Sequence, residues 1–93
     1  GGHGVVSVVS NIVPGKMVEL YNALNESNLT IARRIHFEIY PLIEVLFIEA
    51  NPVPVKKMLE LMNLIDGNPR LPLVSPSKKS ISEIENIKNK LNL

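Results

Sequence analysis

The chain has 93 residues, of which 45% are apolar, and ten lysines and arginines against nine acidic residues give a formal net charge of +1. This apolar content excludes a disordered chain and fits one small domain. The near-neutral charge offers no clustered basic face, so a nucleic-acid partner is not expected.

The absence of cysteine excludes disulfides and thiolate zinc sites. The longest apolar stretch, residues 39–50, is interrupted by Pro41 and two glutamates, so no membrane span is expected. No signal peptide is visible, and we expect a cytoplasmic protein.

The apolar run Val5–Val9 predicts a β-strand. Continuous β-branched residues are typical of a strand covered on both faces, as in parallel sheets and barrels. Parallel neighbours require crossovers of about a dozen residues, and nothing after Asn11 resembles a second strand. We therefore expect a mostly α chain with one orphan parallel strand and about four helices. Such a chain is interpreted as the C-terminal piece of a larger α/β protein.

Two helices are predicted before residue 50. Pro14 suits the first turn of a helix that Ser10 or Asn11 would cap. Its apolar stripe consists of Met17, Leu20, Tyr21 and Leu24. Asn28 is predicted to cap the second helix, and Pro41 is expected to kink that helix or split it in two. The second helix also carries a second apolar flank, formed by Phe37, Tyr40, Ile43, Phe47 and Ile48, which predicts burial on two sides or contact with a partner.

Two further helices are predicted in the second half. The third begins near Pro54 and ends at the turn cluster of residues 66–69. Residues 71–74 are expected to be extended and to lie across the helices as an apolar strap. Ser77 and Ser80 both fit as the cap of the last helix, and Ser80 with Glu83 has the spacing of a capping box.

The histidines and the first glycines give no sign of a ligand site. His3 and His36 belong to different predicted elements and lack the spacing of metal ligands, so no metal is expected. Phosphate-binding glycines follow a strand and open a helix. Residues 1–4 precede the predicted strand, so a tight turn or close packing is the better interpretation.

The remaining candidates for chemistry are also better explained by structure. Ser10 has no base near it in sequence, so it is not expected to be a nucleophile. Asn11 could bind a substrate, but helix capping explains it equally well. Lys56 and Lys57 lie in the first turns of the third predicted helix. A Schiff-base lysine needs desolvation to lower its pKa. The surface of an amphipathic helix provides little desolvation.

Three stretches carry a family resemblance. They are Gly1–Val8 with Ser10 and Asn11, then Leu46–Glu49 leading into the run Asn51–Lys56 (NPVPVK), and finally Arg70–Val74. Together with the last helix they resemble the dihydrodipicolinate synthases of the class I pyruvate-dependent aldolase superfamily. The resemblance implies a (β/α)₈ TIM barrel with an appended helical region. Residues 1–27 would be the last barrel strand and helix, and residues 28–93 the C-terminal helical region.

The resemblance also implies a reaction, most of whose residues lie upstream. In this family a lysine forms a Schiff base with pyruvate, and the resulting enamine attacks L-aspartate 4-semialdehyde in lysine biosynthesis, without a cofactor. No catalytic residue of the family matches this chain. Val6 matches an aliphatic residue that lines the pyruvate pocket. The family commonly forms homotetramers, so a homo-oligomer is expected. The chain alone is predicted to be inactive, and the alternative is a stand-alone helical interaction or oligomerisation module.

Overall fold

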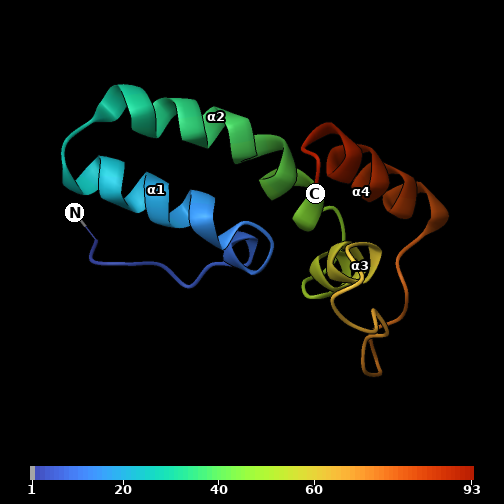
Figure 1. Ribbon diagram of the computed structural model, residues 1–93. Coiled ribbons are helices and arrows are strands. Elements are labelled where there is room, and N and C mark those ends of the chain that lie inside the picture. Colours follow the sequence, from blue (N-terminus) through green and yellow to red (C-terminus); the bar gives the residue numbers. More distant parts are fainter. Residues whose placement is uncertain (1) are drawn as a thin grey trace.

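A computed structural model describes residues 2–93, and Gly1 lies outside the described residues. The chain forms a short 3₁₀ helix followed by four α-helices (Figure 1). They are η1 (Val9–Asn11), α1 (Pro14–Asn25), α2 (Leu29–Leu46), α3 (Val53–Leu61) and α4 (Lys78–Lys90). The prediction of a mostly α chain with about four helices is therefore confirmed. No helix within these residues has the length and apolar character needed to cross a membrane.

The predicted strand Val5–Val9 is wrong for this chain. Residues 4–7 have no regular secondary structure, and Val9 begins η1 instead. The reason is that a strand exists only through hydrogen bonds to a neighbouring strand, and residues 2–93 contain no second one. Val9 is buried, but Val5 and Val6 are exposed. Within residues 2–93 the β-branched run therefore has no sheet to join, and its last residue is helical.

Helices α1 and α2 form an antiparallel pair (Figure 1). Helix α1 begins at Pro14, as predicted, but Ser10 and Asn11 do not cap it, because they belong to η1. The pair is joined by a tight turn in which Ser27 has a positive φ of 57°. The side chain of Asn28 then accepts a hydrogen bond of 3.2 Å from the Ile31 N–H. The predicted cap of α2 is confirmed.

Helix α2 continues through Pro41 to Leu46, so the predicted split into two helices does not occur. A proline inside a helix removes one backbone hydrogen bond. The buried side chains of Ile39 and Leu42, on either side of the proline, hold the helix against its neighbours. The free energy gained by burying these two side chains therefore outweighs the loss of one backbone hydrogen bond.

The second half holds α3 and α4, which pack on each other and on α2. Helix α3 begins at Val53, one residue before the predicted start. Ser77 is the cap of α4, because its hydroxyl accepts a hydrogen bond of 3.2 Å from the Ser80 N–H, and Ser80 lies buried in the first turn. The expected apolar strap is wrong, since Leu71 and Val74 are exposed.

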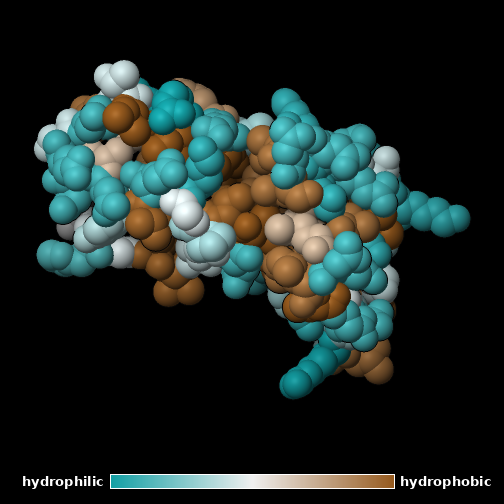
Figure 2. Space-filling view, in the orientation of Figure 1, coloured by the Kyte–Doolittle hydropathy of each residue, from teal (hydrophilic) through white to brown (hydrophobic). Residues whose placement is uncertain are grey.

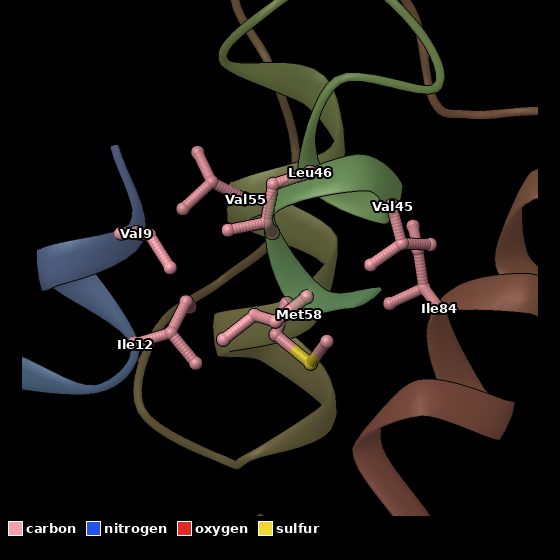
Figure 3. Close-up of a cluster of buried hydrophobic side chains, with 8 residues drawn as sticks. Val9, Ile12, Val45, Leu46, Val55, Met58 and Ile84 are labelled. Carbon is pink, nitrogen blue, oxygen red and sulfur yellow. The ribbon is translucent and has the colours of Figure 1, made fainter. Parts of the chain in front are cut away.

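One cluster of buried side chains joins the η1 region, α2, α3 and α4 (Figure 3), and Met17 of α1 packs against it. It draws Val9 and Ile12 from the η1 region, Leu42, Val45 and Leu46 from α2, Val55 and Met58 from α3, and Ile84 from α4. The end of α2 lies at its centre, which places η1 on one side and α4 on the other (Figure 3). In Figure 2 apolar residues remain visible in the middle of the face shown, between the α1–α2 pair and the α3–α4 pair.

Candidate functional site beside the first helix

The residues that precede α1 run alongside that helix (Figure 1). A groove lies between this segment and the helix. The groove has a volume of about 470 Å³. Its lining is mostly apolar and comprises Gly2, Gly4, Val5, Ser7, Ser10, Pro14, Met17, Val18, Leu20, Tyr21 and Leu24. Helix α1 buries only Ala23 fully, and Tyr21 and Leu24 of the predicted stripe are about half exposed. The stripe therefore faces the groove rather than a closed core.

Val6 is the residue that the family resemblance assigns to the wall of a pyruvate pocket. It is fully exposed and does not line the groove. An aliphatic side chain desolvates a ligand only when other groups enclose the same space. Nothing among residues 2–93 encloses Val6, so its pocket role depends on further protein around it.

Ser10 and Asn11 make local hydrogen bonds. The Ser10 hydroxyl donates to the Ser7 carbonyl oxygen at 2.9 Å, and the Asn11 side-chain amide donates to the Val8 carbonyl oxygen at 2.9 Å. These bonds satisfy carbonyl groups at the start of η1. Both side chains therefore have a structural role here, and neither forms a nucleophile–base pair.

The two histidines lie apart on the surface, as the sequence indicated. His3 is exposed in the segment before η1, and His36 is exposed on α2. The His36 ring lies 5.4 Å from the ring of Phe37 and 5.7 Å from that of Tyr40, measured between centroids. In the part of the chain that the structure describes, no cluster of three or more His, Asp or Glu side chains could hold a metal ion.

The lysines of α3 remain near solvent. Lys56 and Lys57 are both partly exposed, and Lys57 forms an ion pair with Glu60 one turn along the helix. The other lysines, at positions 16, 78, 79, 88 and 90, are also at least partly exposed. A lysine acts as a Schiff-base nucleophile when burial lowers its pKa. None of the seven lysines is in such an environment.

One polar contact joins distant parts of the chain and was not predicted. The Ser77 N–H at the start of α4 donates to the Glu49 carboxylate, between α2 and α3, at 3.0 Å. Hydrogen bonding from the Ser80 side chain and then from the Ser77 backbone lowers the pKa of the Glu49 carboxyl. A carboxylate at a helix N-terminus is stabilising because the free N–H groups carry partial positive charge. No sequence spacing reveals a partner 28 residues away.

The second apolar flank of α2 is largely uncovered. Phe37 is 71% exposed, Phe47 57% and Tyr40 44%. Ile43 instead packs partly against the main core. The prediction that this flank is buried on a second side is therefore wrong within residues 2–93, and contact with a partner remains an untested prediction.

Comparison with known proteins gives consistent matches. Residues 1–91 match the sequence model of the Dihydrodipicolinate synthetase family. The chain is 46% identical over 93 residues to the 4-hydroxy-tetrahydrodipicolinate synthase of Archaeoglobus fulgidus, covering all of this chain and 32% of that protein. Its fold matches the dihydrodipicolinate synthase of Thermotoga maritima with a TM-score of 0.95 at 43% identity, covering 99% of this chain and 31% of that chain.

A second solved structure agrees. The chloride inhibited dihydrodipicolinate synthase from Acinetobacter baumannii, complexed with pyruvate, matches with a TM-score of 0.94 at 33% identity, covering 99% of this chain and 32% of that chain. The chain therefore spans about a third of the length of the relatives that it matches.

Proposed function

Because the chain belongs to the dihydrodipicolinate synthetase family, we propose that it forms the C-terminal portion of a lyase that condenses pyruvate with L-aspartate 4-semialdehyde. The observation that carries the proposal is the 46% identity to the Archaeoglobus fulgidus synthase along all 93 residues. Family membership supports a class I aldolase-type reaction in lysine biosynthesis. A cytoplasmic homo-oligomer, of the homotetramer type, is part of the proposal.

In this proposal residues 1–27 supply the last strand and helix of a TIM barrel, and residues 28–93 the C-terminal helical region. The run Val5–Val9 would then lie between parallel strands, which suits its continuous β-branched side chains. Enclosed in this way, Val6 would form an apolar wall of the pyruvate pocket. Such a wall desolvates a neighbouring amine, which lowers its pKa and favours Schiff-base formation. A relative from Acinetobacter baumannii was solved with pyruvate bound.

The chain alone is proposed to be inactive. Schiff-base formation needs an unprotonated lysine amine held against the ketone carbon of pyruvate. All seven lysines lie on helices and keep contact with solvent. The reactive lysine would therefore come from the part of the family's chain that this sequence does not cover.

A chimeric enzyme tests the function. The segment of the Archaeoglobus fulgidus synthase that matches this chain is replaced by these 93 residues, and condensation of pyruvate with L-aspartate 4-semialdehyde is measured. We expect the chimera to be active, and to remain active with Val6→Ile but not with Val6→Asp, because a carboxylate in the pocket wall would restore polarity beside the amine. A chimera that folds with native-like circular dichroism and has no activity would contradict the proposal.

A second candidate function is a stand-alone helical interaction module. It is favoured by the exposed flank of Phe37, Tyr40 and Phe47, because burying such side chains contributes about 1.5–3 kcal/mol each. Light scattering separates the two candidates. A chain that self-associates, and becomes monomeric with the double substitution Phe37→Ser and Tyr40→Ser, would favour the module.

A further inference from the structure

The turn between α3 and α4 contains the peptide bond that joins Asp66 to Gly67. Asp66 is the chain's only aspartate and is exposed, whereas Gly67 is buried. The main-chain nitrogen of a residue can attack the side-chain carboxyl carbon of the residue before it, which closes a five-membered ring. A Cβ atom on the attacking residue hinders this closure, and glycine has none. The pair therefore consists of the residue types that favour ring closure.

The Asp66 side chain folds forward over Gly67. Its Oδ1 atom accepts a hydrogen bond of 3.2 Å from the Asn68 N–H, which is the hydrogen bond of an Asx turn. This bond holds the carboxyl group beside the Gly67 peptide rather than out in solvent. The electrophilic carbon is therefore kept near the nitrogen that would attack it.

The Gly67 N–H is not engaged elsewhere. It donates no hydrogen bond to any group within residues 2–93. A main-chain N–H that donates to a carbonyl oxygen has to break that bond before its nitrogen can turn toward the side chain, and this adds to the barrier. No such bond has to be broken at Gly67.

The asparagines of the chain lack this combination. Asn51 and Asn68 precede prolines, which have no N–H. Asn63 precedes Leu64, whose N–H donates to the Leu59 carbonyl oxygen at 3.0 Å. The asparagines at positions 11, 22, 25, 28, 86, 89 and 92 precede residues whose N–H lies inside an α-helix or donates to a main-chain carbonyl oxygen. Asp66 is thus singled out among the side chains that could cyclise.

We propose that the peptide bond between Asp66 and Gly67 is a modification site, at which aspartate converts to isoaspartate in the folded protein. The Gly67 nitrogen forms a bond to the Asp66 Cγ atom of the neutral carboxylic acid. The carboxyl hydroxyl leaves with the amide proton as water, which gives a cyclic imide. Solvent water then adds to the main-chain carbonyl carbon of Asp66 and breaks its bond to the Gly67 nitrogen, so the chain now runs through the side-chain carbon.

The product cannot keep the geometry of this turn. Isoaspartate adds one carbon atom to the main chain and moves the free carboxylate to the α-carbon. Gly67 already packs closely on α3, since a Cβ atom built on it would lie 2.6 Å from Glu60 Oε2 and 2.8 Å from Glu60 Cβ. The longer main chain therefore has to shift Gly67 away from Glu60, and the hydrogen bond between Asp66 and the Asn68 N–H is lost. The inference is independent of the proposed lyase function, because it concerns only this turn.

A single aspartate makes the test specific. An endoproteinase that cuts before aspartate, and not before isoaspartate, cleaves the unmodified chain only between Ile65 and Asp66. The folded chain is stored near neutral pH and sampled over weeks. The fraction that resists cleavage should rise with time, and that fraction should accept one methyl group from S-adenosylmethionine and an isoaspartyl methyltransferase. The Asn68 amide should exchange with solvent faster in the aged chain than in the fresh one, because its acceptor has moved.

Two controls decide whether the fold and the residue pair are responsible. Asp66→Glu keeps the charge but needs a six-membered ring, so methyl acceptance should fall to background. Equal acceptance by Asp66→Glu, or methyl groups that map to an asparagine position, would overturn the proposal. The second control is the chain stored in urea. If isoaspartate accumulates there while the folded chain stays fully cleavable before Asp66, the fold protects this site and the proposal is wrong.

Discussion

Removing the side chain of Ile84 should show how firmly α4 is held to the rest of the molecule. Ile84 is 0% exposed and is the residue that α4 contributes to the buried cluster, where it lies against Val45 of α2 (Figure 3). Replacement by alanine deletes three carbon atoms, and at about 0.8 kcal/mol each the transfer term is about 2.4 kcal/mol. The cavity left behind adds to this, which gives an expected loss of about 3–4 kcal/mol.

Urea unfolding followed by far-ultraviolet circular dichroism measures this loss. A small domain has an unfolding free energy of about 5–15 kcal/mol. Ile84→Ala should therefore lower the urea concentration at the unfolding midpoint by a large fraction. Val74→Ala is the matched control, because Val74 is exposed and its truncation should cost less than about 0.5 kcal/mol. A loss below about 1 kcal/mol for Ile84→Ala would refute the assignment of Ile84 to the core.

Three further changes test local features by the same unfolding assay. Asn28→Ala should cost about 1 kcal/mol because it removes the cap of α2, whereas Asn28→Asp should be nearly neutral, and equal losses would contradict the cap. The folded-state pKa of Glu49 is lowered from 4.5, so its carboxylate stabilises the fold above that pH and the contribution disappears as the pH falls through the lower folded value. Glu49→Gln should therefore be less stable than the native chain at pH 7 but not at strongly acidic pH, and a difference that persists in acid would argue against the ionised contact. Gly67→Ala places a Cβ 2.6 Å from Glu60 Oε2 and 2.8 Å from Glu60 Cβ, so a loss of about 1–3 kcal/mol is expected, and a neutral effect would mean that the turn moves freely.

The helices were predictable because their signals are local. The cap at Asn28 and the proline-led starts of α1 and α3 depend on a few neighbouring residues. The absence of a strand at Val5–Val9 was not predictable from local signals. A strand depends on a partner strand, and residues 2–93 do not supply one. The choice of Ser77 over Ser80 as cap follows from the burial of Ser80, which spacing alone does not reveal.

For the candidate site, too, features with local signals were predictable and features that depend on distant parts of the chain were not. The structure places both histidines on the surface, bonds the Ser10 hydroxyl to the Ser7 carbonyl oxygen and leaves the α3 lysines partly exposed. The groove beside α1 was missed, although the stripe that lines it was identified. A stripe indicates which side chains share a face but not whether that face is covered. The role of Val6 stays a prediction, since it depends on protein beyond these residues.

We propose that this chain supplies an apolar wall of a pyruvate-binding lyase but not its reactive lysine, and intact mass after treatment with pyruvate and borohydride tests both parts of this proposal. Borohydride reduces an imine between a lysine amine and the ketone carbon of pyruvate to a stable secondary amine, so each reacted lysine gains mass. The chimera with the Archaeoglobus fulgidus synthase should gain a single pyruvate-derived adduct, and the 10.3 kDa chain alone should stay unmodified. A specific adduct on the isolated chain, or none on a folded chimera, would show that the proposal is wrong.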